Sequence, residues 1–309
     1  PMTLEQLKSF AAVARCGSFT RAAEELHLTQ PAVSAQILAL ERDYDARLLD
    51  RIGKRVEITE PGRVVLAAAQ DVLRRVDELG EEMRDIEGLQ RGRLRLGASL
   101  IVGIYLLPEA IGRFKRDYPK LELSLRIEYA RRIAERVLAG DVDLGIIGEG
   151  APIADERLVV EPFAPDELVL IVDPGHRWAR RKRVAARELA GESFIISEKG
   201  SATQEIIVSR LADAGARLDI AMELGNIEAV KRAVEAGLGI SIMSRCAIER
   251  DVEEGRLAAI RLADVKMGRS LSFVRRRGQR ASRAARAFME FFAARFKSPT
   301  AGAGRAPVS

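Results

Sequence analysis

Hydrophobic residues repeat with two different periods, and the change near residue 93 constrains the fold more than any other feature. Up to residue 86, apart from a short segment at 48–59, the apolar positions recur every three or four residues, as on one face of a helix. From Arg93 onward, short apolar runs of strand type alternate with helical segments. The 309 residues suffice for roughly two or three domains. The sequence therefore predicts an α+β multidomain chain, with a helical N-terminal part joined to an α/β part.

Three short helices and a hairpin are predicted before residue 62. The spacing of apolar residues predicts a first helix over 3–15, while Ser18 and Thr29 are suitable N-caps for a second and a third. Two strand-like segments, 48–51 and 56–59, flank a basic hairpin. This order is typical of a winged helix-turn-helix, predicted for residues 1–61.

The third helix carries side chains suited to base edges. In a helix-turn-helix, the second helix of the pair enters the major groove. Gln can bond adenine, Ser can bond several bases, and Ala or Pro carbons can touch a thymine methyl. The predicted DNA-contacting residues are Thr20, Gln30, Pro31, Ala32, Ser34, Ala35, Gln36 and the wing residues Arg51, Lys54 and Arg55. A three-helix scaffold with solvated polar residues is the alternative, and spacing alone does not separate the two.

The net charge of +5 does not support DNA binding. Residues 1–62 carry eight Lys and Arg against nine Asp and Glu, whereas residues 269–297 carry nine against one. The basic C-terminal face is interpreted as solvated, with an accessory DNA or subunit contact as the alternative.

A heptad pattern follows the predicted wing. The apolar positions alternate spacings of four and three, which predicts a narrow helix–helix seam. Its members are Val65, Ala69, Val72, Val76, Leu79, Met83 and Ile86. We predict a linker and dimerisation helix with a hinge over 62–92. A helix packed on its own domain is the alternative.

The strand and helix order after residue 93 occurs twice. Such alternation predicts a largely parallel sheet with helices on both faces. We predict lobe I at about 93–163 and 267–297, and lobe II at about 164–266. Residues 298–309, rich in Pro, Gly, Ala and Ser, are predicted to be a disordered tail.

Several function classes lack support in the sequence. It shows no nucleophile–base pair, metal cluster or cofactor loop, so neither catalysis nor a cofactor is predicted. Cys16 and Cys246 lie far apart, which fits a reducing cytoplasm. No apolar run approaches the roughly 18 residues of a membrane span, and the N-terminus lacks a signal-peptide layout. A cytoplasmic protein without a membrane partner is expected.

Motifs along nearly the whole chain resemble the LysR-type transcriptional regulators. They lie at residues 4–10, 17–23, 28–34, 48–51, 59–62, 106–108, 140–146 and 237–240. The resemblance implies a DNA-binding regulator that forms a homodimer or homotetramer. Many members have Arg where this chain has Ala35, which puts a borrowed operator sequence in doubt. A solute-binding module without a transcriptional role is the alternative, but it leaves the first 92 residues unused.

The resemblance also implies a periplasmic-binding-protein-like effector domain over 93–297, with a small-molecule cleft between its lobes. Hydroxyl residues at predicted helix N-termini after strands suit an anion there. The predicted effector-binding residues are Ser99, Leu100, Ile127, Tyr129, Ile147, Glu149, Ser201, Ala202, Thr203 and Asn226. For each hydroxyl, an ordinary N-cap is the alternative.

Segments 198–205 and 222–225 are similar to the branch that regulates CO2-fixation and sulphur-assimilation genes. Relatives there often have Arg where this chain has Gln204. We therefore expect a small anionic or polar effector of low charge.

Overall fold

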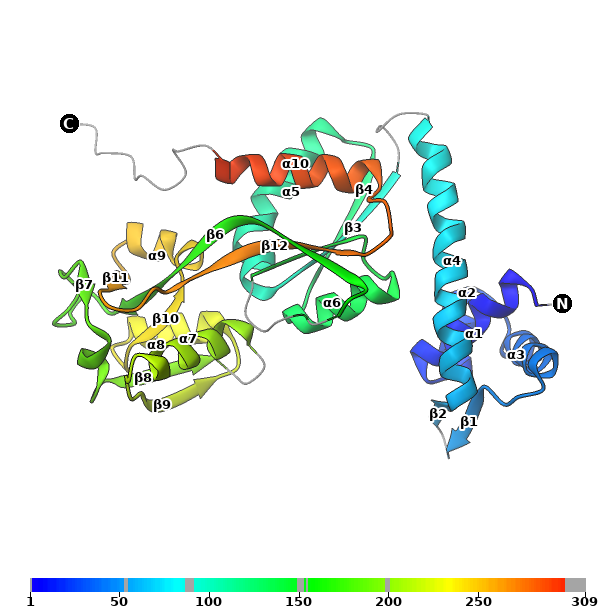
Figure 1. Ribbon diagram of the computed structural model, residues 1–309, viewed down its shortest axis with the longest axis horizontal. Coiled ribbons are helices and arrows are strands. Elements are labelled where there is room, and N and C mark those ends of the chain that lie inside the picture. Colours follow the sequence, from blue (N-terminus) through cyan, green and yellow to red (C-terminus); the bar gives the residue numbers. More distant parts are fainter. Residues whose placement is uncertain are drawn as a thin grey trace. The chain divides into compact units, whose positions relative to one another are not determined.

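The computed structural model describes residues 2–52, 55–86, 92–148, 153, 155–197 and 201–297. The chain divides into two compact units, residues 1–86 and 87–309. Figure 1 labels their helices and strands. Of the hinge predicted at 88–92, residues 88–91 lie outside the described residues, as does the predicted tail at 298–309, while Gly92 is the first residue of a strand.

The first unit has the predicted helix-turn-helix with a wing. Its elements are α1 (Leu4–Cys16), α2 (Phe19–Leu26), α3 (Gln30–Tyr44), β1 (Leu49–Ile52), β2 (Arg55–Ile58) and α4 (Glu60–Ile86). The caps follow the local sequence, since the side chain of Ser18 accepts from the Arg21 amide and that of Thr29 from the Ala32 amide. The N-caps predicted for α2 and α3 are thus confirmed.

Helix α4 begins by packing on the rest of its unit. Phe10, Val33 and Leu48 form part of a buried core that also includes Ala69 of α4. A Cβ atom at Gly62 would lie 2.1 Å from the carbonyl oxygen of Leu48. Only glycine permits so close an approach, so this residue fixes where α4 leaves the wing.

The second unit alternates strands and helices. Its first elements are β3 (Gly92–Ala98), the π-helix η1 (Val102–Leu106), α5 (Leu107–Asp117), β4 (Leu121–Ile127), α6 (Ala130–Ala139), β5 (Leu144–Gly148), β6 (Leu158–Val172) and β7 (Arg183–Val184). There follow η2 (Ala186–Leu189), β8 (Ser193–Ser197), α7 (Ala202–Asp213), β9 (Asp219–Leu224), α8 (Ile227–Glu235) and β10 (Ser241–Ser244). The last are η3 (Arg245–Ala247), α9 (Glu249–Glu253), β11 (Ala258–Leu262), β12 (Gly268–Arg276) and α10 (Arg283–Lys297).

The main sheet of this unit is mixed. Its strand order is β4-β3-β5-β12-β6-β11-β7, with β10 also paired to β6. Strands β3, β4 and β5 are parallel, but β6 runs antiparallel to β10, β11 and β12. The expectation of a largely parallel sheet was therefore wrong, because β6 and β12 form antiparallel pairs through the middle of the sheet.

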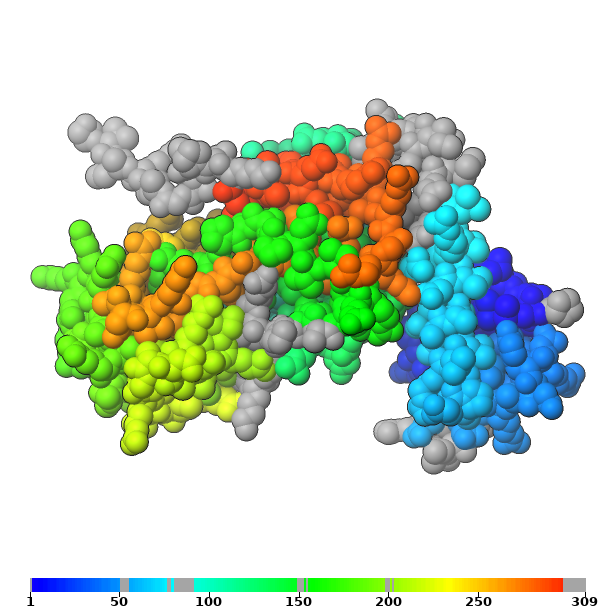
Figure 2. All heavy atoms as spheres, in the orientation of Figure 1, coloured from blue at the N-terminus to red at the C-terminus, as the bar shows by residue number. Residues whose placement is uncertain are grey.

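Strands β6 and β12 pair along their length and run between two hydrophobic cores (Figure 1). The first core includes Leu96, Phe114 and Phe288, and the second includes Leu170 and Phe194. Helix α10 lies on the first core, and Figure 2 shows it, in orange to red, beside the green atoms of β6. The two strands thus connect lobe I and lobe II.

Candidate functional site

The N-terminal part of α3 presents the residues predicted to meet DNA. Gln30, Pro31 and Ala35 are exposed, and Ala32 and Ser34 are half-buried. The opposite side of the helix is buried through Val33, Ile37 and Leu40. Thr20, near the start of α2, is exposed as well. The helix therefore has one anchored face and one free face of polar and small side chains.

Gln36 and Leu38 depart from the predicted pattern. The hydroxyl of Ser9 on α1 donates to Oε1 of Gln36, so this side chain helps to hold α1 against α3. Leu38 is 49% exposed and lies three residues beyond Ala35. A leucine spaced like a core residue gives no sequence signal of exposure, which is why it was missed.

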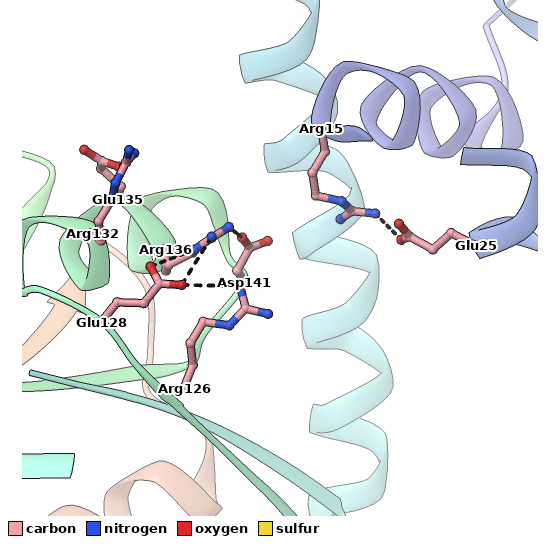
Figure 3. A network of polar contacts seen from close by, with 8 residues as sticks. All are labelled: Arg15, Glu25, Arg126, Glu128, Arg132, Glu135, Arg136 and Asp141. Atoms are coloured by element: carbon pink, nitrogen blue, oxygen red, sulfur yellow. Dashed lines mark hydrogen bonds and ion pairs between the residues drawn. The ribbon is translucent and has the colours of Figure 1, made fainter. Parts of the chain in front are cut away.

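The basic residues around the wing are placed only in part. Arg51 lies on β1 and Arg55 on β2, while Lys54 lies outside the described residues. In the same unit, Arg15 pairs with Glu25 and so links α1 to α2, as Figure 3 shows.

The heptad seam of α4 divides into two parts. Ala69 is 1% exposed and belongs to the core of its own unit. Val65 is half-buried against the same core. Val72, Val76 and Leu79 are exposed to 40%, 43% and 59%. The first part of the seam therefore packs on its own domain, as the alternative interpretation expected. The outer part is exposed and can pack against another helix. The side chains of Met83 and Ile86 lie outside the described residues.

A cavity of about 760 Å³ lies between the two lobes. It collects most of the residues predicted for effector binding: Ser99, Leu100, Ile127, Tyr129, Ser201, Thr203 and Asn226. Ile147 is buried in a core behind it, and the next residue, Gly148, forms the wall instead. Neighbouring residues of a strand face opposite sides of the sheet. The prediction of Ile147 as a cavity residue was therefore wrong by one position. Glu149 lies outside the described residues, and Ala202 is the first residue of α7.

The hydroxyl and amide groups of this cavity also have structural roles. Ser201 caps α7 by accepting from the Gln204 amide, and Asn226 caps α8 by accepting from the Ala229 amide. The hydroxyl oxygen of Ser99 accepts from the Gly148 amide at 3.2 Å. Ser201 and Asn226 are therefore N-caps and cavity walls at once.

Arg269 is the cavity residue that the sequence analysis missed. Its side chain is only 3% exposed, and its Nε donates to Oδ2 of Asp166 at 2.7 Å. Its Nη1 donates to the hydroxyl of Thr203 at 2.5 Å. Nη2 has no hydrogen-bond partner in the described part of the chain. The two partners of the ion pair are 103 residues apart in sequence but directly opposite in the β6–β12 register, so only the pairing of these strands reveals them.

Glycine at position 148 makes room for this arginine. A Cβ atom there would lie 2.6 Å from the guanidinium carbon of Arg269. The end of β5 thus fixes the guanidinium from lobe I, while Thr203 holds it from lobe II.

The acidic residues of the cavity are already paired. Figure 3 shows Glu128 between Arg126 and Arg136, with ion-pair distances of 3.9 and 3.3 Å. The carboxylates of Asp141 and Glu128 raise the pKa of Arg136. Glu228 pairs with Lys231 at 3.2 Å. Lys231 also pairs with the buried Asp251 at 2.6 Å, so Glu228 shares its counter-ion, whereas Glu128 lies between two arginines.

Two polar contacts join the lobes beside the cavity. The Tyr105 hydroxyl of η1 donates to Glu228 of α8, and burial together with this carboxylate raises the pKa of Tyr105. Arg131 of α6 forms an ion pair with Glu205 of α7 at 3.8 Å. Both contacts would have to change if the lobes moved apart.

The basic C-terminal face binds its own lobe. Arg275 pairs with Glu161 at 3.1 Å, Arg276 donates to the Leu138 carbonyl at 3.2 Å, and Arg277 donates to the Glu156 carbonyl at 2.7 Å. These contacts support a structural role for the face over an accessory DNA contact.

Both cysteines are expected to be slow nucleophiles. Burial raises the pKa of the Cys246 thiol to about 12, and burial with the Glu25 contact raises that of Cys16. At pH 8 only about 10⁻⁴ of Cys246 would be thiolate, so aromatic disulfide reagents should modify it at least ~100-fold more slowly in the folded protein than in urea. Absorbance of the released thiolate measures this. Stoichiometric release within seconds from the folded protein would contradict it.

Among the described residues, no helix is long and apolar enough to cross a membrane. In the same residues, no three His, Cys, Asp or Glu side chains are grouped to hold a metal ion.

Comparison with known proteins places both units in one family. Residues 4–63 match the bacterial regulatory helix-turn-helix protein family of lysR type, and residues 87–297 match the LysR substrate binding domain. A probable RuBisCO transcriptional regulator of Cyanophora paradoxa is 37% identical over 294 residues, covering 94% of this chain and 91% of that protein. One from Trichormus variabilis is 37% identical over 303 residues, covering 97% and 90%.

Solved structures share the fold. A full-length OxyR variant from Pseudomonas aeruginosa gives a TM-score of 0.76 at 22% identity, covering 95% of this chain and 94% of that one. The Synechocystis CcmR regulatory domain in complex with 2-PG gives 0.62 at 27% identity, covering 68% and 99%. The predicted fold, of a winged helix-turn-helix followed by a two-lobed effector domain, is confirmed. The chain belongs to the LysR family and is a DNA-binding transcriptional regulator with an effector-binding domain, not an enzyme.

Proposed function

We propose that this regulator acts as a homodimer or homotetramer in the cytoplasm, where a small anionic or polar metabolite controls its activity from the interlobe cavity. The cavity of about 760 Å³ carries the proposal, since its walls come from both lobes. A ligand there can shift an equilibrium between lobe arrangements only through contacts that differ between them. The boundaries 1–61, 62–92 and 93–297 are part of this proposal.

The effector class is supported by the polar groups in the cavity wall. Ser99, Ser201, Thr203 and Asn226 bring hydroxyl and amide groups to a cavity whose wall also carries charged and apolar side chains. The similar CcmR regulatory domain holds the small molecule 2-PG, which supports a ligand of comparable size.

A thermal-shift screen of small carboxylates, phosphates and sulphur metabolites tests the effector proposal. A ligand at 100 times its dissociation constant adds about 2.7 kcal/mol to the free energy of unfolding. That gain should raise the melting temperature of the full chain and be lost in Ser99→Trp, which fills the cavity. Equal shifts in both proteins would place binding elsewhere, and a flat screen would count against the site.

The exposed part of the α4 seam is proposed to pair two chains. Val72, Val76 and Leu79 leave an apolar stripe on a helix whose inner part is already packed. Two such stripes side by side would bury each other and set two recognition helices on a pseudo-palindromic site.

Val76→Glu should therefore weaken self-association roughly 100-fold or more, because each dimer would bury two unpaired carboxylates. Sedimentation velocity across a concentration series measures this. Ala67→Glu is the matched control, since Ala67 is exposed on the same helix outside the seam. A Val76→Glu protein that stays as oligomeric as Ala67→Glu would contradict the assignment.

DNA recognition is proposed to rely on Gln30, Ser34 and apolar contacts. Ala35 supplies no guanidinium, so bidentate guanine contacts from this position are absent. Sequence-dependent DNA shape would then contribute more of the specificity. Arg51, Lys54 and Arg55 of the wing are proposed to contact phosphates.

A further inference from the structure

An apolar stripe runs along the outward side of α3. Pro31, Ala35 and Leu38 are spaced by four and three residues, which places them in one row on a helix. All three are exposed, and Leu38 is 49% exposed. None of the three side chains donates or accepts a hydrogen bond. The row continues one turn later with Arg42, so its first part offers only carbon atoms to a partner.

This stripe of Pro31, Ala35 and Leu38 lies opposite the side that anchors α3. Successive residues of an α-helix are rotated by about 100°, so residues two apart point in nearly opposite directions. Ala35 is two residues from Val33 and from Ile37, and both of these are buried in the core that α3 forms with α1 and α2. The stripe is therefore the part of α3 that extends farthest from its own unit.

The polar side chains at the start of α3 lie beside the stripe. Gln30 and the half-buried Ser34 lie on one flank. Gln36 lies on the other flank, where its Oε1 accepts from the hydroxyl of Ser9. Hydrogen bonding to bases is thus confined to one edge of the helix, and the centre of its outward side is apolar.

The chemistry of the major groove shows what such a stripe can recognise. Among the groups that base edges present there, the thymine methyl is the apolar one, while the edge of a G·C pair presents donors and acceptors that carbon cannot satisfy. Ala35 and Leu38 are three residues apart, or about 4.5 Å along the helix axis. This distance is close to the ~3.4 Å between successive base pairs. The two side chains can therefore meet methyl groups of neighbouring pairs.

We propose that Leu38, together with Ala35, selects two neighbouring T·A pairs in each half-site by contacting their thymine methyl groups. The inference rests on the proposed placement of α3 in the major groove. It adds Leu38, which is not among the predicted DNA-contacting residues, as a residue that determines specificity.

Uracil replacement in the DNA tests the proposal, because it removes the thymine methyl and leaves base pairing unchanged. Each thymine in the upstream DNA that the full chain protects from nuclease cleavage is replaced in turn, and fluorescence anisotropy gives the affinity. At two neighbouring pairs of each half-site, the affinity should fall about fourfold per methyl, as expected for the loss of one buried methyl group. The other thymines should tolerate the replacement.

Variants of Leu38 connect the DNA methyl to this side chain. Leu38→Ala should weaken binding to unmodified DNA roughly tenfold over two half-sites and should abolish the uracil effect at one of the two pairs. Leu38→Gln keeps the length but not the apolar surface, so it should also abolish that effect, whereas Leu38→Met should retain it. Leu4→Gln changes another exposed leucine, at the start of α1, and should leave affinity and uracil pattern unchanged. Urea unfolding checks that each variant is folded.

Specific binding that no uracil replacement weakens would overturn the inference, and so would an identical uracil pattern in the wild type and in folded Leu38→Ala. Either result would leave the DNA-binding function intact. A wild-type protein that does not prefer its upstream DNA over scrambled DNA would instead contradict the proposed function, and this inference with it. The two failures are therefore distinguishable.

Discussion

Ala35→Asp should lower the affinity of the protein for its specific DNA by roughly 100-fold. Ala35 is exposed on the free face of α3, where base edges are expected. A carboxylate there loses apolar contact and repels the phosphates, at about 1.4 kcal/mol or more per half-site. A dimer carries the change twice, which multiplies two tenfold losses. Fluorescence anisotropy with labelled operator DNA measures the effect.

Ala67→Asp is the control for this substitution. It adds the same charge to an exposed alanine of the same unit, away from α3. Its affinity should stay within about twofold of the wild type, because distant surface charges act weakly at physiological salt. Equal losses in the two variants would show that net charge, and not the position on α3, controls binding.

Asp166→Asn should lower the free energy of unfolding of the effector unit by about 3–5 kcal/mol. Asp166 and Arg269 are 4% and 3% exposed, with a 2.7 Å contact. Removing one partner of a buried ion pair leaves the other charge without compensation. The urea midpoint of the full chain should fall with an unchanged slope.

The neighbouring residue provides the control. Glu167 pairs with Arg261, and the two side chains are 34% and 57% exposed. Glu167→Gln should therefore change stability by only about 0–1 kcal/mol. The double variant Asp166→Leu/Arg269→Met should recover most of the loss, since apolar groups can replace a buried pair. A loss no larger than that of Glu167→Gln would contradict a buried, tightly coupled pair.

Local signals in the sequence predicted local structure well. The side chains of Ser18 and Thr29 each accept a hydrogen bond from an amide three residues later in the chain. Such a contact depends only on local sequence, so it could be predicted. Ser201 and Asn226 were placed at the cavity because each follows a strand and caps a helix.

Features that depend on distant pairing were not predictable in this way. The first part of β6 contains Pro162, Pro165 and several charges, which argue against a strand in isolation. It is a strand because β12 pairs along it, and the register shifts where Phe163 is left without an opposite residue. Arg269 was missed for the same reason. Ala69 fitted the heptad spacing, but spacing cannot tell which neighbour a helix packs against.

Binding of the wild-type protein to the DNA upstream of its own gene tests the central claim most directly. Anisotropy should show sub-micromolar affinity, a preference of at least ~1,000-fold over scrambled DNA, and steep weakening between 50 and 200 mM salt. Addition of a cavity ligand found in the screen should change that affinity or the stretch of DNA that the bound protein protects from nuclease cleavage. Binding at micromolar protein without sequence preference would contradict the assignment of α3 as a recognition helix in a ligand-controlled regulator.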